Sequence, residues 1–141
     1  MEYSYKFRLY PNTEQQTLIQ KTFGCTRFVY NHFLAQRIAE YKATSKAPTR
    51  FQQDKRLTSM KKEIPWLCEV DATALQSSIQ TLDVAYQNFF RRVKSGGKPG
   101  FPKFKSKKSR HQSYKSKCVG TNIKVLGNAV QLPKLGLVKC R

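Results

Sequence analysis

The last part of this sequence has no acidic residue. All eight aspartates and glutamates lie before residue 84, whereas 27 lysines and arginines are spread along the 141 residues and give a net charge of +19. Residues 1–90 carry 12 cations and 8 anions, and residues 91–141 carry 15 cations alone. Because self-repulsion of this size disfavours a compact state, the composition predicts a polyanionic partner that binds chiefly residues 91–141.

The sequence also lacks the patterns of membrane and secreted proteins. No apolar run approaches the ~20 residues that span a bilayer, and the N-terminus does not resemble a signal peptide. The 4 cysteines are far apart, with no C-x-x-C pair, so we expect reduced thiols rather than a zinc ribbon or a disulfide framework. These absences predict an intracellular protein, cytoplasmic or nuclear, with no membrane partner.

Groups suited to catalysis are scarce. Metal-dependent nucleases need two or three convergent carboxylates to hold Mg²⁺, and the acids of this chain fall at predicted helix caps or on polar helix faces. His32 and His111 stand at no metal-binding or triad spacing. We therefore expect this chain to have no catalytic residue, no enzymatic activity and no metal or other cofactor.

The hydrophobic pattern predicts an α+β protein that begins with a strand. Alternating apolar residues from Tyr3 to Leu9 predict a first strand in residues 1–11, with Tyr5 and Phe7 on its buried face. Asn12 or Thr13 is placed to cap a helix, with Gln15 or Gln16 completing a capping box. Gly24 is expected to divide residues 12–42 into two helices, either a helix-turn-helix or a plain helical hairpin.

Two further helices are predicted over residues 49–62 and 72–94, capped by Thr49 and Asp71. The second ends at Ser95-Gly96-Gly97 and is expected to turn Phe89, Phe90 and Val93 toward the core. Residues 96–117 have no periodicity and form a basic linker. In residues 118–141 a period of two returns, with a hairpin across Gly127-Asn128. The simplest architecture is a helical lobe, residues 12–95, inserted after the first strand of a small β-sheet or barrel. Its open strand edge suggests the front part of a longer protein.

The segment from Arg91 to Lys117 contains 11 cations, with Phe101, Phe104 and Tyr114 among them. The rings could stack on bases, or Phe101 and Phe104 could pin the loop to the core; in both cases we interpret the cations as phosphate contacts. The candidate phosphate-binding or RNA-binding residues are Lys6, Arg8, Arg91, Arg92, Lys94, Lys98, Lys103, Phe104, Lys105, Lys107, Lys108, Lys115 and Lys117.

Polar residues on three predicted helices are candidates for reading base edges. In the helix after Gly24 the outward positions include Thr26, Arg27, Asn31, Gln36 and Arg37. Arginine recognises guanine, and glutamine recognises adenine, through paired hydrogen bonds. The helix over residues 49–62 and the side of the next helix that carries Gln76 are richer in such groups.

Five stretches, residues 7–12, 23–31, 85–90, 100–105 and 132–136, together resemble one family in the same order. They are similar to the N-terminal part of the OrfB/TnpB proteins of bacterial insertion sequences, compact RNA-guided DNA endonucleases related to the type V CRISPR effectors. The resemblance implies a wedge domain, an oligonucleotide-binding-type barrel, interrupted after its first strand by a helical recognition domain. It also implies a protein of the bacterial or archaeal cytoplasm.

In that family the barrel and helices hold the guide (omega) RNA and read a short motif on target DNA. By position, the motif-reading residues would fall at Arg50, Asp54, Gln76, Val119 and Gly120, of which only Gln76 keeps the expected residue type. The RuvC nuclease with its carboxylates, and the C-x-x-C zinc element, lie downstream in the family and are absent from this sequence. Mg²⁺ and Zn²⁺ are therefore expected only in those domains.

Three hypotheses follow for the function. The first is the nucleic-acid-binding N-terminal portion of a TnpB-type nuclease, with guide RNA and target DNA as partners. The second is a stand-alone helix-turn-helix DNA-binding regulator. The third is a truncated, inactive transposase-associated product that folds poorly.

Overall fold

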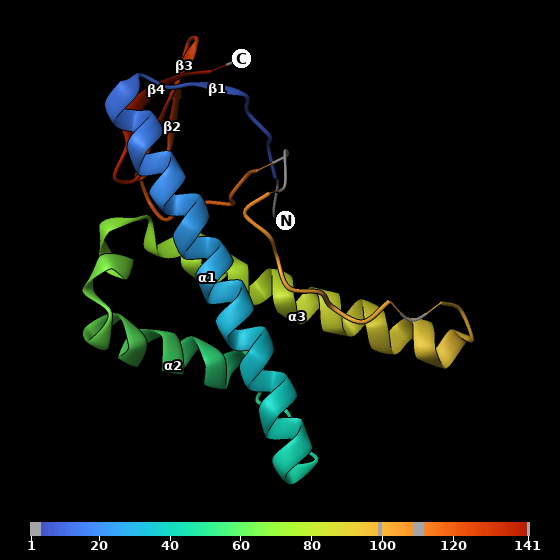
Figure 1. Cartoon of the computed structure of the whole chain (residues 1–141). Helices are drawn as coiled ribbons and strands as arrows, with labels where there is room; N and C mark the ends of the chain where they lie inside the picture. The colour runs from blue at the N-terminus through green and yellow to red at the C-terminus, as the bar shows by residue number, and fades with distance from the viewer. Residues whose placement is uncertain (1–3, 99, 109–111, 141) are drawn as a thin grey trace.

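The computed structural model describes residues 4–98, 100–108 and 112–140; Tyr3 and His111, named above, lie outside this part. Strand β1 (Leu9–Tyr10) precedes helices α1 (Thr13–Thr44), α2 (Arg50–Glu63), the short 3-10 helix η1 (Pro65–Glu69) and α3 (Ala72–Ser95). Strands β2 (Lys124–Leu126), β3 (Ala129–Leu132) and β4 (Gly136–Cys140) follow. The predicted α+β class is confirmed: the helices form one lobe, and the sheet lies at the N-terminal end of α1 (Figure 1).

Helix α1 is continuous, so the turn predicted at Gly24 is wrong. The helix begins at the predicted capping box, where Asn12 Oδ1 accepts a hydrogen bond from the Gln15 amide at 2.9 Å. Thr22 before Gly24, and Cys25 and Val29 after it, are all buried. Because the packed face runs across Gly24, its burial offsets the roughly 1 kcal/mol that a glycine costs inside a helix.

The core lies between α1, α2, η1 and α3. Its fully buried side chains include Phe33 and Leu34 of α1, Leu67 of η1, and Leu75 and Ile79 of α3. Helices α2 and α3 match the predicted ranges to within one residue, with Thr49 and Asp71 as their N-caps. The last turns of α3 extend past this core.

In the helices, three side chains differ from their predicted exposure. Phe90 and Val93, expected in the core, are 55% and 53% exposed because α3 continues beyond the helices that cover it. Arg37, expected at the surface, is buried; its Nε donates to Gln53 Oε1 at 2.9 Å and its Nη2 to Asp83 Oδ1 at 3.2 Å. Burial of this guanidinium is compatible with the fold because Asp83 offsets its charge and both residues accept hydrogen bonds from it.

The sheet is antiparallel, in the order β1-β4-β3-β2. The predicted hairpin across Gly127-Asn128 is confirmed, and the first strand pairs with a late strand as expected, with Leu9 opposite Cys140. Within the described residues no pairing joins β1 to β2, so the sheet is open.

The first strand is much shorter than predicted, and Tyr5 and Phe7 are exposed rather than buried. Among the described residues the pairing of β1 with β4 includes only Leu9 and Tyr10, so residues 4–7 have no strand partner there. Gln15 joins the sheet to α1, because its Nε2 donates to the Leu137 carbonyl at 2.7 Å.

Candidate nucleic-acid interface

The basic segment after α3 is fixed to the helical lobe. We call residues 100–108 and 112–117 the basic strap. It has no regular secondary structure, doubles back along α3 and then passes α1 to reach the sheet (Figure 1). At its start the Phe101 ring packs edge-on against Tyr86 and Phe89 of α3, with centroids 5.6 and 5.2 Å apart.

The second anchor of the strap is a clamp made by Asn31 of α1. Its Oδ1 accepts a hydrogen bond from the Lys105 amide at 2.7 Å, and its Nδ2 donates to the Lys105 carbonyl at 2.9 Å. The Lys105 ammonium lies 4.5 Å from the centroid of the Tyr30 ring, and partial desolvation there lowers its pKa. Asn31 therefore fixes backbone, and a cation–π contact holds the side chain in place.

The last part of the strap rests on α1 and on the beginning of α3. Tyr114 packs edge-on against Phe23 with centroids 6.0 Å apart; burial, reinforced by Asp71, raises its pKa to about 12. The Ser116 hydroxyl donates to the Asp71 carboxylate, and the Lys117 amide donates to Thr73 Oγ1 at 3.1 Å. The strap is thus held at both ends and in the middle.

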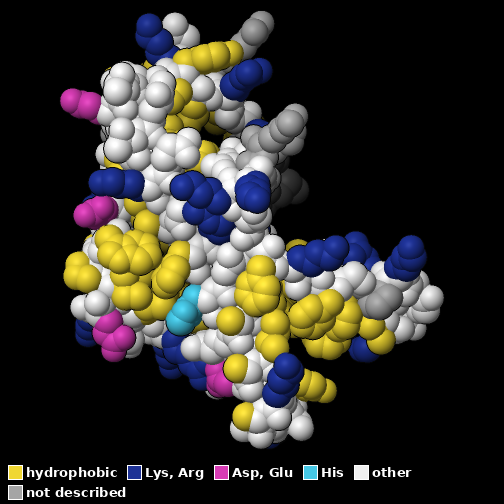
Figure 2. Space-filling model, viewed as in Figure 1, with side chains coloured by type: hydrophobic (Ala, Val, Ile, Leu, Met, Phe, Trp, Pro, Cys, Tyr) yellow, Lys and Arg dark blue, Asp and Glu magenta, His cyan; other side chains and the backbone are white. Residues whose placement is uncertain are grey.

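Among the described residues, the cations of the strap and of the end of α3 have no acidic partner. The ion pairs found among the described residues all lie elsewhere: they join Lys21 to Glu69, Arg37 to Asp83, Arg50 to Asp54 and Arg56 to Glu40. In Figure 2 basic side chains line the upper edge of the α3 arm, and the acidic side chains visible in this view lie away from that arm. The candidate phosphate-binding cations are all exposed: Lys6, Arg8, Arg91, Arg92, Lys94, Lys98, Lys103, Lys105, Lys107, Lys108, Lys115 and Lys117.

The three aromatic residues of the strap divide into two kinds. Phe101 and Tyr114 pack against helices and therefore act as anchors. Phe104 is 56% exposed, and it makes no ring contact with the described residues. Of the two alternatives given for these rings, Phe101 fixes the loop to the core. The Phe104 ring is the one that is open to a ligand.

The motif-reading candidates lie on α2, on α3 and in the turn before β2. Arg50 Nε is 3.9 Å from Asp54 Oδ2, and burial raises the Asp54 pKa while Arg50 and then Lys117 oppose that shift. Gln76 is exposed and lies one turn after Thr73, the residue that contacts Lys117. Arg50 and Asp54 thus partly neutralise each other, whereas the Gln76 amide is accessible.

Val119 and Gly120 belong to a turn that Asn122 holds closed. Asn122 accepts from the Val119 amide at 2.7 Å and donates to the Lys117 carbonyl at 3.0 Å. Gly120 has a φ of 68°, a conformation that suits glycine. The Lys117 amide is hydrogen-bonded to Thr73, so this turn comes immediately after the point where the chain contacts the N-terminal end of α3.

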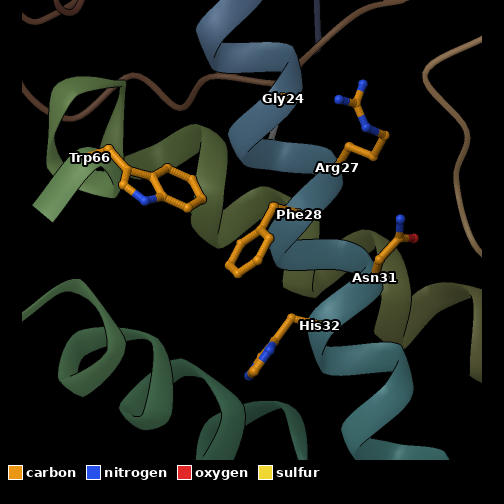
Figure 3. A pocket seen from close by; sticks show the side chains of 6 residues that line it. All are labelled: Gly24, Arg27, Phe28, Asn31, His32 and Trp66. Atoms are coloured by element: carbon orange, nitrogen blue, oxygen red, sulfur yellow. The ribbon is translucent and has the colours of Figure 1, made fainter. Parts of the chain in front are cut away.

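A pocket that the sequence did not reveal opens on the exposed face of α1. Figure 3 shows its lining: Gly24, Arg27, Phe28, Asn31 and His32 from α1, and Trp66 from η1. Phe28 lies between two rings, stacked on His32 at 5.8 Å and edge-on to Trp66 at 5.1 Å. The one signal for it in the sequence is Trp66 itself, the single tryptophan of the chain.

Two other features are absent from the described residues. No helix there is both long and apolar enough to cross a membrane. In the same residues, no three histidine, cysteine, aspartate or glutamate side chains come together as a metal site would require.

Comparisons with known proteins identify relatives that cover 72% to 98% of this chain. Residues 1–46, which form β1 and α1 here, match a family model described as a helix-turn-helix domain, of the OrfB type. A candidate RNA-guided DNA endonuclease of Streptomyces pristinaespiralis is 33% identical over 112 residues, covering 78% of this chain and 27% of that protein. InsQ of Escherichia coli K12, named as the same kind of protein, is 29% identical over 140 residues, covering 98% of this chain and 33% of InsQ.

A third relative is similar to this chain in extent. Virulence protein VsdF of Salmonella dublin is 32% identical over 111 residues, which make up 72% of this chain and 91% of that protein. The chain spans at most a third of the length of the two endonuclease-named relatives. It belongs to the OrfB/TnpB family and corresponds to the N-terminal part of its members.

Proposed function

We propose that this chain binds nucleic acid as the N-terminal portion of a TnpB-type RNA-guided nuclease, with guide RNA and target-adjacent DNA as its ligands. In this proposal the sheet belongs to the wedge domain, α1–α3 form the recognition lobe, and the strap with the end of α3 follows a phosphate backbone. Base pairing by the guide RNA then supplies most of the sequence recognition.

One observation carries this proposal: the strap holds its backbone fixed while its lysines stay exposed and, within the described residues, unpaired with any acid. A mobile polylysine segment would lose conformational entropy on binding, whereas a backbone fixed by Asn31, Phe101 and Ser116 has already lost it. Exposed cations on such a backbone therefore contact phosphates at a smaller entropic cost than those of a solvated tail. Phosphate contacts from lysine and arginine supply most of the affinity in protein–nucleic-acid complexes.

The regulator hypothesis is less well supported. A helix-turn-helix protein places a separate second helix in the major groove, and residues 25–42 continue α1 without a turn. Arg37, one of the residues proposed to read bases from that helix, is buried against Gln53 and Asp83. Among the motif-reading candidates we keep Gln76, Val119 and Gly120 as the positions for DNA contact.

Competition binding tests the proposal. The purified chain is bound to a labelled hairpin RNA and challenged with unlabelled hairpin RNA or with duplex DNA that has the same number of phosphates. We expect the RNA to compete at lower concentration. Equal competition by both, and by a polyanion such as heparin, would contradict guide-RNA binding and leave only general charge attraction.

The Gln76→Ala variant tests the DNA part of the proposal. We expect a changed preference at one position in a library of duplexes, with unchanged affinity for the hairpin RNA. Gln80→Ala, one turn further along α3, is the matched control. A uniform loss of affinity for every ligand would mean that Gln76 supports the structure rather than reading a base.

A further inference from the structure

We infer that the pocket between α1 and η1 binds one unpaired nucleobase of a single strand of RNA or DNA. This inference rests on the proposed function and gives a role to Phe28, His32 and Trp66, which lie outside the strap and outside the motif-reading candidates. It starts from Trp66, a residue that is 45% exposed although its ring already packs against Phe28.

The shape of the pocket suits a flat ring. Gly24 and Phe28 lie one turn apart on α1, and the glycine leaves room where a side chain would otherwise stand. Trp66 and His32 flank Phe28, so that three rings form one wall of the pocket (Figure 3). A large exposed aromatic surface of this kind is a typical platform for a base, because every base has a stackable face.

The opposite side of the pocket is polar and basic. Arg27 and Asn31 project there, away from Trp66 (Figure 3). The Asn31 amide already bonds both backbone groups of Lys105, yet its oxygen and nitrogen each keep capacity for one more hydrogen bond. A base that lies on the aromatic wall therefore meets hydrogen-bonding groups at its edge, and its phosphate meets the Arg27 guanidinium.

Continuity with the strap determines the kind of ligand. Asn31 lines the pocket and also bonds the Lys105 backbone, so Asn31 is shared by the pocket and the strap. A phosphate chain that follows the strap past Lys105 therefore passes next to the pocket. The net charge of +19 favours an anionic ligand over an acid-poor protein segment. A base within a duplex has both faces stacked and its pairing edge occupied, so entry into the pocket requires an unpaired base.

Trp66 is the only tryptophan in the chain, so its fluorescence reports on this pocket alone. Four probes are titrated into the purified chain: a single-stranded oligoribonucleotide without self-pairing, the matching oligodeoxyribonucleotide, an abasic deoxyribose-phosphate oligomer of equal length, and a blunt duplex. We expect one or both single strands to quench the tryptophan. The abasic oligomer and the duplex should bind, as measured by anisotropy of an end label, without quenching.

Two variants and a control make the test specific. Trp66→Leu should weaken single-strand binding by about 5- to 150-fold, as expected for one stacked base, and leave abasic binding unchanged. His32→Ala keeps the fluorophore and removes an exposed ring, so it tests the pocket even where Trp66→Leu does not fold. Tyr41→Ala removes an exposed ring further along α1 and should change nothing.

The outcomes separate this inference from the proposed function. Quenching by the RNA alone, or by the DNA alone, supports the inference and identifies the strand. Salt-dependent binding of all four probes without quenching overturns it and leaves the proposed function intact. The absence of binding to every probe overturns both.

Discussion

Asn31→Ala should release the strap from α1 without unfolding the helical lobe. The substitution removes two hydrogen bonds, at 2.7 and 2.9 Å, to the Lys105 backbone. At about 0.5 to 1.5 kcal/mol for each net hydrogen bond, the destabilisation is about 1 to 3 kcal/mol. The open population of the strap should therefore rise roughly 5- to 150-fold.

Limited proteolysis with trypsin measures this opening, because Lys103, Lys105 and Lys107 are cleavage sites within the clamped segment. When opening is fast relative to cleavage, the cleavage rate follows the open population. Mass spectrometry of the early fragments should then show faster cleavage at these lysines in Asn31→Ala than in the wild type. The thermal midpoint, measured in parallel, should fall only slightly.

Asn122→Ala is the matched control, since the Asn122 side chain also makes two hydrogen bonds to backbone, accepting from the Val119 amide and donating to the Lys117 carbonyl. It should expose Lys117 to cleavage and leave residues 103–107 protected. Unchanged cleavage of the strap in Asn31→Ala would refute the clamp. Early cleavage spread over α1 and α3 would also refute it, because Asn31 would then support the core.

Two further predictions concern the core and pH. Arg37→Ala should lower the free energy of unfolding in urea by about 1.5 to 3 kcal/mol, because the buried Gln53 Oε1 loses its donor and the half-buried Asp83 loses its cationic partner, keeping only the hydrogen bond from Gln87. Arg56→Ala, at a surface pair with Glu40, should have a much smaller effect. Equal effects of the two substitutions would contradict the assignment. Burial holds the Tyr114 pKa at about 12 in the folded state, above the ordinary value of 10.0, so stability should be complete below pH 10 and fall as the pH rises toward 12. The decrease amounts to about 3 kcal/mol at most, because one pKa unit is worth about 1.4 kcal/mol. Tyr114→Phe should give a shallower decline, although Tyr30 and Tyr86, whose pKa values burial also raises, act in the same direction in both proteins; an identical pH dependence would show that Tyr114 is not buried in solution.

Local sequence signals predicted most of the secondary structure. The capping box at Asn12, the threonine and aspartate caps at Thr49 and Asp71, and the glycine stop at Gly96 are interactions within one turn, so their residues are neighbours in sequence. The hairpin at Gly127 is local in the same way. These features are visible in a single sequence because the atoms that interact are a few residues apart.

The errors arose where packing overrides local preference. Gly24 looked like a turn, but the faces before and after it pack on the same core, and this burial keeps α1 continuous. Tyr5 and Phe7 alternate as a strand does, yet among the described residues β1 pairs with β4 only at Leu9 and Tyr10, and both rings stay exposed. Phe90 and Val93 follow the periodicity of α3 beyond the point where other helices cover it.

The charge of the candidate site was predictable from the sequence, whereas the contacts that hold the strap and form the pocket were not. The excess of cations in residues 91–117 follows from the absence of acids after Asp83. The clamp joins residues 74 positions apart, and the contact of Ser116 with Asp71 spans 45 positions, so no local pattern reports either. The pocket was missed for the same reason, because Trp66 reaches Phe28 from another element.

The salt dependence of binding tests the central claim, that the anchored strap contacts phosphates. Affinity for a duplex DNA is measured over a series of salt concentrations for the wild type, for Lys103→Glu with Lys107→Glu, and for Lys46→Glu with Lys62→Glu, which changes the net charge equally at exposed positions outside the strap. We expect the strap variant to reduce the slope of log K against log salt by about two, roughly 0.9 for each phosphate that is no longer neutralised. The control should keep the wild-type slope. An equal reduction in both variants, or none in the strap variant, would contradict the claim.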